Sequence, residues 1–380
     1  MRHNHAVYPG TRLSKAKSMA YGGDEVRIRG FVWLAAGLLL AGCGSGGDEK
    51  GGTAGAGGTS ASTSQSSGKK LLVGIVFDSG GIGDKSFNDS ANAGVQRAAQ
   101  ELGAEIKSAD SKSEKDYEPN IEGMAEKGCD VIFAVGFKQE SALKAVAPKY
   151  PKVSFAIIDD VVKLPNVRSL VFSENEGSFL AGYLAALVSK TGKIGFVGGM
   201  TSPLIKKFET GYVAGAKTGR ADIDASGIKY TESWDDSSLG KLSAASLFSG
   251  GCDIVYHAAG RCGLGVISAA KDANKLAIGV DSDQDGEAQG NVLTSMVKHV
   301  DVAVFSTIKD VKDGKFTADV HQYDLKSGGV GLTEFKYTKD KIGDANLKKL
   351  ADVSKQIVDG KLKVPGTDDE LKAYLATLKK

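Results

Sequence analysis

The run Gly192-Lys193-Ile194-Gly195-Phe196-Val197-Gly198-Gly199 is apolar and ends in two glycines, which predicts a buried β-strand followed by a tight turn. It comes after a long amphipathic stretch, residues 176–190, that is typical of a helix. The run therefore restarts a pattern of strand followed by helix that first begins at Leu71. We expect a second lobe of the molecule to begin just before it.

The same alternation of short apolar runs with longer amphipathic runs extends to both sides of this stretch. Several strand candidates are apolar on both faces, as in a parallel sheet covered by helices on each side, and the alternation indicates a doubly wound α/β architecture. About 310 residues form this part of the chain, which is large for one such sheet and natural for two. The predicted strands are residues 71–77, 131–135, 153–158, 169–172, 193–197, 253–258, 276–280 and 292–296, and the predicted helices are residues 89–102, 141–147, 176–190, 206–218, 239–249, 266–273, 302–311 and 347–359.

The loop after the first predicted strand, residues 78–88, is a candidate site because ligands of doubly wound sheets bind beyond the carboxyl ends of the strands. Lys85 and Ser86 follow glycines there, as in a phosphate-binding loop, but Asp84 stands where that loop needs glycine. Its carboxylate would repel phosphate. The loop instead offers a carboxylate, a hydroxyl, an amide and the Phe87 ring, which suit a neutral polar ligand with a flat face.

The N-terminal region predicts export and a membrane anchor. Residues 31–40 form an apolar run behind Arg27 and Arg29, and small residues and Cys43 follow it. This is the organisation of a secretory signal peptide, and the run is too short to span a bilayer, which takes about 20 apolar residues. The stretch resembles a bacterial lipobox, in which the cysteine thiol is acylated and becomes the new N-terminus. We therefore expect residues 26–42 to be a signal peptide and Cys43 to carry the lipid.

Two further segments flank this signal. Residues 43–69 contain little besides Gly, Ser, Thr and Ala after the cysteine, and such a stretch buries too little surface to fold, so we expect a flexible tether. Residues 1–25 fit no signal-peptide pattern. We expect them to be a mis-annotated leader, with translation beginning at Val26 and with Met19 as the competing start.

Composition narrows the possible partners. The 380 residues carry 48 Lys and Arg against 46 Asp and Glu, a net charge of +2, which argues against a nucleic-acid partner held by bulk charge. The histidines beyond the leader are scattered, so neither a metal site nor a cofactor is expected. Besides Cys43 there are Cys129, Cys252 and Cys262. An exported protein could join Cys252 to Cys262, but buried free thiols are favoured.

The loop of residues 78–88 resembles the signature of the basic membrane lipoproteins, the purine nucleoside receptor-like substrate-binding proteins of ABC importers. Similar motifs follow in family order over roughly residues 71–330, and only together are they specific. They are Phe155-Ala156-Ile157-Ile158-Asp159, Glu176-Gly177-Ser178-Phe179-Leu180-Ala181-Gly182, Phe208-Glu209-Thr210-Gly211-Tyr212, Ile278-Gly279-Val280-Asp281-Ser282-Asp283-Gln284 and Leu293-Thr294-Ser295-Met296-Val297-Lys298.

This resemblance implies a type I periplasmic-binding-protein fold, in which two Rossmann-like α/β lobes joined by a hinge close on a ligand. We expect lobe 1 to contain residues 70–175 and about 300–325. Lobe 2 is expected to contain residues 176–299 and about 326–380.

The resemblance also implies how a nucleoside would be held. In that family two aromatic rings grip the base; Phe87 falls on the first position, and Trp234 matches the second, where Phe is more frequent. Stacking of a base on an aromatic ring contributes about 1–3 kcal/mol. Asp281 and Lys298 match the pair that binds the ribose, and a carboxylate can accept hydrogen bonds from both vicinal hydroxyls.

Further positions have smaller expected roles. Asp78 fits an acceptor on the base side or on the ribose side, and Ser86 and Asn88 can contact polar edges of the ligand. Gly260 matches a glycine that lets the backbone approach the ligand. Asp159 ends a strand on the ligand side, where it either contacts the ligand or acts as a helix cap or hinge contact.

One motif departs from the family. After Gly260 the family usually continues Gly-Thr-Gly, whereas this chain has Arg261-Cys262-Gly263. The guanidinium could reach the ligand or the other lobe, but we expect it to point to solvent.

The sequence therefore predicts a lipid-anchored binding protein, not an enzyme, that delivers nucleosides to the permease and ATPase subunits of an ABC importer. It would act as a monomer on the extracytoplasmic face of a bacterial cell membrane. Alternatives are a binding protein for riboflavin or a sugar, a surface receptor lipoprotein without transport function, and a secreted nucleoside hydrolase or nucleotidase. The last needs clustered metal ligands or a nucleophile with a base, and Asp281, Asp283 and Asp285, the one close set, resemble a loop cap.

Overall fold

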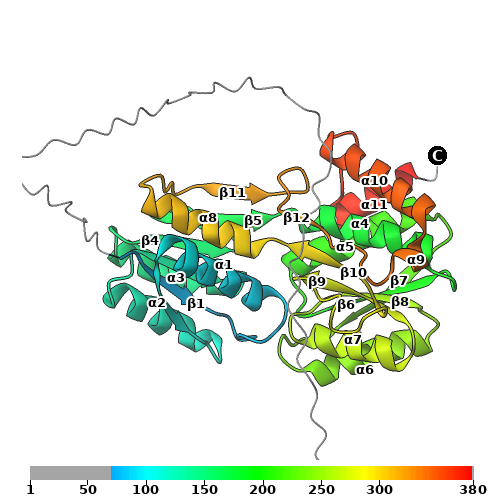
Figure 1. The fold of residues 1–380 in the computed structure, drawn as a ribbon, viewed down its shortest axis with the longest axis horizontal. Helices are drawn as coiled ribbons and strands as arrows, with labels where there is room; N and C mark the ends of the chain where they lie inside the picture. The colour runs from blue at the N-terminus through cyan, green and yellow to red at the C-terminus, as the bar shows by residue number, and fades with distance from the viewer. Residues whose placement is uncertain (1–69, 379–380) are drawn as a thin grey trace, which may run out of the picture. The chain divides into compact units, whose positions relative to one another are not determined.

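A computed structural model of the protein describes residues 70–378. The predicted leader, signal peptide, lipidated Cys43 and tether lie outside the described residues. These described residues form one compact unit, which contains two six-stranded sheets with helices packed on them (Figure 1). Within residues 70–378, no helix is both long enough and apolar enough to cross a membrane.

The first sheet has the strand order β11-β5-β4-β3-β1-β2, and all its neighbouring strands are parallel. Its strands are β1 Leu72–Val76, β2 Glu105–Ala109, β3 Val131–Val135, β4 Ser154–Ile158, β5 Val167–Phe172 and β11 Val320–Tyr323. The helices of this lobe are α1 Phe87–Leu102, α2 Tyr117–Glu126, α3 Glu140–Val146 and α8 Val300–Lys312, with short 3-10 turns at Glu114–Asp116, Phe137–Gln139 and Ala147–Lys149.

The second sheet has the order β12-β10-β9-β8-β6-β7 and is parallel except for β12, which runs antiparallel to β10. Its strands are β6 Lys193–Gly198, β7 Asp224–Tyr230, β8 Ile254–Ala258, β9 Leu276–Asp281, β10 Val292–Lys298 and β12 Val330–Leu332. The helices of this lobe are α4 Glu174–Val188, α5 Pro203–Gly219, α6 Ser237–Ser249, α7 Cys262–Asp272, α9 Lys339–Ile342, α10 Asp344–Val358 and α11 Asp368–Thr377.

The chain passes between the two sheets three times. It leaves the first sheet after β5 and enters α4, which packs on α5 and β10. It returns after β10 into α8, which packs on α1, β3 and β4, and it crosses again between β11 and β12. Both Glu174, the first residue of α4, and Lys298, the last of β10, therefore stand at crossings.

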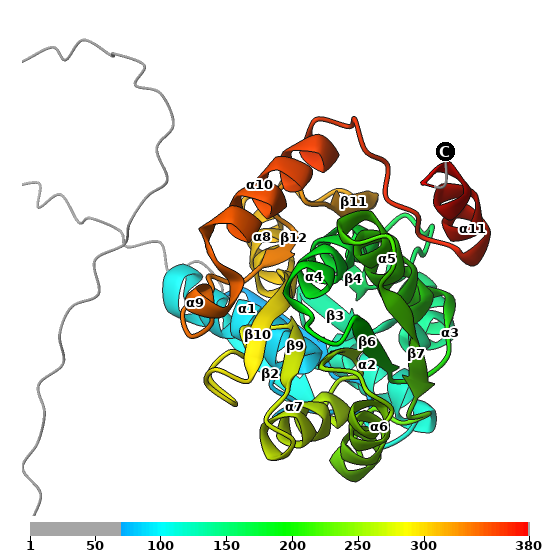
Figure 2. The ribbon, with the colours of Figure 1, turned by 90° about the vertical axis from the view of Figure 1, so that its right-hand side faces the viewer.

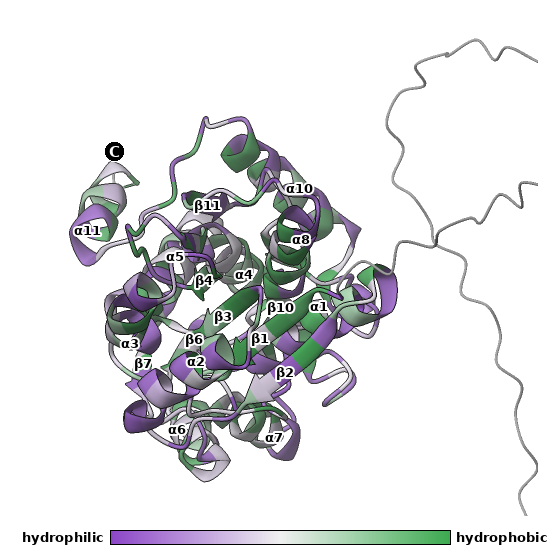
Figure 3. Ribbon diagram, turned by 90° about the vertical axis from the view of Figure 1, so that its left-hand side faces the viewer, coloured by the Kyte–Doolittle hydropathy of each residue, from purple (hydrophilic) through white to green (hydrophobic). Residues whose placement is uncertain are grey.

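The core follows from the hydropathy of the strands. All five residues of β3 are buried, and Figure 3 shows β1 and β3 as hydrophobic segments behind helices whose outer faces are hydrophilic. Figure 2 shows α4 and α5 side by side in the second lobe. Their backbones approach closely, because a Cβ atom on Gly182 would lie 1.9 Å from the carbonyl oxygen of Tyr212. Glycine is therefore required at this helix contact.

The structure confirms the predicted α/β class and two-lobe architecture, and it corrects the inventory of elements. The sequence prediction missed β2, β7, β11 and β12, which are edge strands, together with α2, α9 and α11. Edge strands such as Glu105–Ala109 are only half-buried and lack an apolar run. The predicted start of α7 at residue 266 was wrong, since Cys262 begins it. Gly263 and Gly265 conceal the helical pattern there.

Candidate functional site

Loops at the carboxyl ends of strands in both sheets line one pocket, whose empty volume is ≈ 560 Å³ including space open to solvent. Of the nine predicted ligand-binding residues, all except Ser86 line it. These are Asp78, Phe87, Asn88, Asp159, Trp234, Gly260, Asp281 and Lys298. Residues far apart in the sequence thus meet at one site, as expected for switch points of doubly wound sheets.

Ser86 has a different place. It is fully buried, and its hydroxyl donates to the Asp281 carboxylate Oδ2 at 2.6 Å, across the two lobes. Ser282 donates its own hydroxyl to the Ser86 carbonyl oxygen at 2.9 Å. Ser86 is outside the pocket lining and is engaged by the opposite lobe, so it orients Asp281.

The N-terminus of α1 is capped by Asp84, a residue that the sequence singled out only as a departure from a phosphate loop. Its carboxylate accepts hydrogen bonds from the backbone N–H groups of Ser86 at 2.9 Å, Asn88 at 2.9 Å and Asp89 at 3.1 Å. A phosphate group binds a helix N-terminus through such N–H groups. Here a buried carboxylate already occupies them, which disfavours an anionic ligand.

One end of the pocket is rich in hydrogen-bond acceptors. Asp78 Oδ1 accepts from the Gly80 N–H at 2.9 Å and from Asn88 Nδ2 at 3.0 Å. Asn88 also donates to Asp84, so its amide nitrogen is engaged twice, whereas its Oδ1 is buried without a partner. Burial raises the pKa of Asp78. An unpaired buried acceptor is rare in native proteins, and a ligand donor would satisfy it.

The two predicted rings come from opposite lobes. Phe87 is the first residue of α1, and Trp234 lies between β7 and α6. A Cβ atom on Gly199 would lie 2.3 Å from Cζ3 of Trp234, so the indole packs directly on this glycine. A Cβ on Gly260, where φ is +54°, would meet the Trp234 carbonyl oxygen at 3.2 Å. Both glycines therefore fix the position of the indole.

A cluster of buried charges lies at the lobe crossings. Lys298, 1% exposed, donates to Asp159 Oδ2 at 2.6 Å across the lobes. Its ammonium is also 3.2 Å from Glu174 Oε1, without hydrogen-bond geometry, and Glu174 is completely buried. The other Glu174 oxygen lies 3.4 Å from Nζ of Lys207, which is 39% exposed. The sequence prediction missed Glu174.

Burial and the neighbouring charges together shift the pKa values of this cluster. Burial raises the pKa of Asp159 to about 7 and that of Asp281 to about 6, although Lys298 acts in the opposite direction. Burial disfavours the charge on Lys298, but Asp159, Glu174 and Asp281 together outweigh it, so its pKa lies above the usual value. Three carboxylates share one buried ammonium, which stays protonated.

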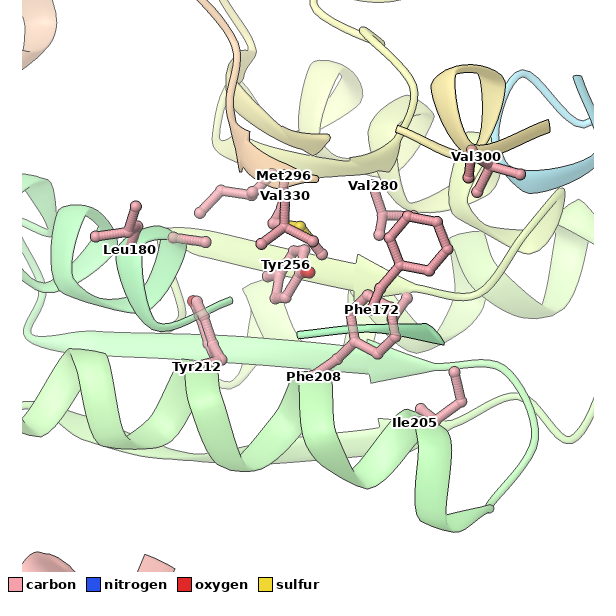
Figure 4. Packing of buried hydrophobic residues seen from close by; sticks show 14 of the residues in the cluster. Phe172, Leu180, Ile205, Phe208, Tyr212, Tyr256, Val280, Met296, Val300 and Val330 are labelled. Carbon is pink, nitrogen blue, oxygen red and sulfur yellow. The ribbon is translucent and has the colours of Figure 1, made fainter. Parts of the chain in front are cut away.

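Aromatic rings surround the same ammonium. Nζ of Lys298 lies 5.1 Å from the ring centroid of Phe87, 5.0 Å from that of Phe172 and 5.7 Å from that of Phe208. Figure 4 shows Phe172, Phe208 and Ile205 among the buried hydrophobic residues of this region. The rings exclude water from the charges, which strengthens the pairing of Lys298 with the carboxylates.

The backbone is strained at two of these carboxylates. Asp159 has φ of 72° and Asp281 has φ of 63°, in the left-handed region that favours glycine. Such strain clusters at functional sites, where surrounding contacts hold it. Both residues stand at the carboxyl end of a strand and point a charged group into the pocket.

Two expectations from the sequence concern side chains that do not line the pocket. The expectation that Arg261 points to solvent was wrong, because its Nη2 donates to the carbonyl oxygens of Gly80 at 3.2 Å and Ile82 at 2.9 Å in the other lobe. The second concerns the three described cysteines, which are free and buried, so Cys252 and Cys262 form no disulfide.

In residues 70–378, no group of three or more His, Cys, Asp or Glu is placed to hold a metal ion.

Comparison with known proteins identifies the family of this two-lobed site. Residues 71–368 match the family of PnrA-like ABC transporter substrate-binding proteins. The chain belongs to that family. A PnrA-like relative, the "ABC transporter nucleoside-binding protein BmpA" of Lactococcus lactis subsp. cremoris, is 40% identical over 318 residues, 78% of this chain and 89% of its own length. Basic membrane protein A of Borreliella burgdorferi is 35% identical over 311 residues, 80% and 90% of the respective chains.

Solved structures agree with the PnrA-like assignment. A solute-binding protein of an ABC transporter system from Aeropyrum pernix K1 superimposes with a TM-score of 0.75 at 29% identity, covering 81% of this chain and 97% of that one. The resemblance derived from the sequence motifs is thereby confirmed. This PnrA-like protein is therefore similar to substrate-binding components of ABC transporters in both sequence and fold.

Two residues beside Lys298 carried little signal in the sequence of this PnrA-like protein. Glu174, which does not line the pocket, is the first residue of α4, where an acidic residue is ordinary. Phe208 belongs to one of the family motifs, but it lies in a helix and resembles a core residue. The crossing from β5 into α4 brings Glu174 to Lys298.

Proposed function

We propose that this protein is the lipid-anchored receptor of an ABC importer and that it binds nucleosides, preferentially purine nucleosides, between its two lobes. The observation that carries the proposal is that Phe87 and Trp234, from opposite lobes, line one pocket together with Asp281 and Lys298. Membership of the family and the nucleoside-binding name of the L. lactis relative support the ligand class.

The base would stack between the two rings and present its polar edge to the acceptor-rich end. Asn88 Oδ1 has no partner, so an N–H donor on a purine edge would satisfy it, and Asp78 beside it can accept a second donor. A neutral ligand also agrees with the capping of α1 by Asp84, which leaves a phosphate no free N–H groups there.

The ribose would lie against the charge cluster. Asp281 Oδ2 is oriented by Ser86, and an ionised carboxylate can accept hydrogen bonds from both vicinal hydroxyls. Lys298, held between Asp159 and Glu174, offers donors on the same side. These contacts favour ribonucleosides over deoxyribonucleosides.

The membrane anchor and the transport partners rest on the sequence and the family. Acylation of Cys43 would place the folded unit on the extracytoplasmic face of the cell membrane, beyond a tether of residues 43–69. From there it would deliver ligand to permease and ATPase subunits as a monomer. Mass spectrometry of the N-terminal peptide of the native protein tests the anchor: an unmodified Cys43, or a mature chain starting elsewhere, contradicts it.

The ligand assignment is tested by titration. Residues 66–380 contain Trp234 as their one tryptophan. After unfolding and refolding to remove carried ligand, guanosine, inosine, adenosine, uridine and riboflavin are added while tryptophan emission is followed. We expect saturable changes with purine nucleosides at micromolar concentrations or below. A response to riboflavin alone indicates the alternative binding protein, and release of free base indicates a hydrolase.

Affinity should fall in acid. The pKa of Asp281 is raised to about 6, so between pH 7.5 and pH 5 its carboxylate becomes mostly protonated and stops accepting both ribose hydroxyls. Guanosine binding should weaken roughly tenfold over this range, since each pH unit below the pKa removes a factor of ten of the ionised form. Calorimetry at the two pH values measures the weakening. In an Asp281→Asn variant, which has no carboxylate at this position, the tenfold difference between the two pH values should disappear.

Through Asp281, acid should stabilise the ligand-free protein, although it weakens binding of the ligand. Asp281 keeps a proton in the folded protein at pH values where the unfolded chain, with an ordinary pKa near 3.9, has released it. Its contribution to the free energy of unfolding is therefore complete below about pH 4 and is lost as the pH rises to about 6. Acid therefore weakens binding but favours folding through Asp281. The Asp281→Asn variant should lose the contribution of this group to both pH dependences.

A further inference from the structure

The loop of residues 78–88 is held from the opposite lobe at four of its backbone carbonyl groups. At its inner end, Gln284 Nε2 donates to the Lys85 carbonyl oxygen at 3.0 Å, and Ser282 donates to that of Ser86 at 2.9 Å. At its outer end, Arg261 donates through one nitrogen to the carbonyl oxygens of Gly80 and Ile82. The lobes are thus closed, and side chains of one lobe satisfy backbone acceptors of the other.

Arg261 connects the two loops that carry the aromatic rings. Its backbone N–H donates to the Trp234 carbonyl oxygen at 3.0 Å, and its guanidinium grips the loop that leads into Phe87. The spacing between the two rings therefore depends on a contact that exists only while the lobes are closed.

We propose that Arg261 is a latch that holds the two lobes closed over the pocket and slows the release of the ligand. It acts on the lobes and not on the ligand, since it lies outside the pocket lining. The guanidinium suits this role because one of its terminal nitrogens carries two N–H donors, enough for both carbonyl oxygens.

The size of the effect follows from two charged hydrogen bonds, one of them exposed to solvent. A hydrogen bond to a charged group contributes more than a neutral one, and exposure reduces it. We expect Arg261→Ala to release guanosine about tenfold faster with little change in the association rate, because most interface changes act on dissociation. Arg261→Lys should fall between, since lysine keeps the charge and N–H donors but lacks the planar guanidinium that fixes their directions.

The experiment measures release and closure separately in residues 66–380, the compact unit. Release of guanosine is followed by Trp234 emission after rapid dilution. Closure is followed without ligand, as the distance between spin labels placed by Lys115→Cys and Leu242→Cys, one exposed residue in each lobe; the native cysteines are buried. Arg220→Ala is the matched control, because Arg220 pairs with Asp222 inside one lobe.

Faster release from Arg261→Ala, with longer label distances and an unchanged Arg220→Ala protein, supports the latch. Unchanged release within twofold and unchanged distances overturn it. Faster release at unchanged distances also overturns it, because Arg261 would then act on the ligand. The latch proposal depends on the proposed function only in the choice of guanosine as the ligand. If guanosine fails to bind the wild-type protein, the nucleoside proposal fails, and the ligand-free distances alone decide the latch.

Discussion

Replacing Lys298 with methionine lowers the free energy of unfolding by about 3–5 kcal/mol at neutral pH, the usual effect of removing one partner of a buried ion pair. Lys298 is 1% exposed, and its loss leaves Asp159 and Glu174, both at most 4% exposed, without their cation. Methionine keeps much of the volume among the rings of Phe172 and Phe208, so packing changes little. Denaturant unfolding at pH 7.5 measures the loss.

Lys207→Met is the matched control. Lys207 lies 3.4 Å from the other oxygen of the same Glu174, but its side chain is 39% exposed. Partly exposed pairs contribute about 0–1 kcal/mol, so this variant should remain within that range. The loss in Lys298→Met should also shrink in acid, because Asp159, whose pKa burial raises to about 7, can then be neutralised by a proton. Equal losses in the two variants would contradict the buried-charge explanation.

Replacing Trp234 with alanine weakens guanosine binding by about 1–3 kcal/mol, or roughly 5- to 150-fold, through the loss of one stacking surface. The indole packs directly on Gly199, and the backbone carbonyl oxygen of Trp234 accepts a hydrogen bond from the Arg261 N–H. The position of the ring is therefore set before the ligand arrives. Preorganisation of this kind makes a ring effective in binding, since little side-chain freedom remains to be lost. Calorimetry measures the change, because the variant has no tryptophan emission in residues 66–380.

Trp234→Phe is the conservative counterpart. It keeps a flat ring in the same loop and should recover most of the affinity, with a loss smaller than that of alanine. Ligand-free stability should change little in either variant, because Trp234 is only partly buried. If the Trp234→Ala protein remains folded and binds guanosine as tightly as the wild type, Trp234 is not part of a base-stacking pair. The second stacking ring must then be sought at Phe208 or Phe137, which also line the pocket.

The sequence predicted the site through the ends of strands. Asp78 and Asp159 follow strands at their carboxyl ends, Asp281 is the last residue of β9, and the family motifs pointed to Phe87 and Lys298. These residues are local signals, because a polar residue directly after an apolar strand is visible without knowing the fold. Whether they bind a nucleoside stays a prediction until the titration is done.

Contacts between lobes could not be predicted in this way. Ser86 was expected at a ligand edge, and Arg261 in solvent, but each bonds to the opposite lobe. Glu174 was not singled out at all, although it is fully buried beside Lys298. The partners in these contacts stand 195 and 179 residues apart in the first two cases, so no local pattern relates them.

By itself the sequence determined the α/β class, the repetition of the strand–helix pattern in two lobes and the family, because hydrophobic periodicity and short motifs are properties of neighbouring residues. The tertiary structure alone decided which of the polar residues line the pocket and which hold the lobes together. It also decided that one buried ammonium is shared by several carboxylates. The physical reason is that three crossings between the sheets set these distances, and the charge, burial and pKa of each group depend on neighbours that only the closed fold supplies.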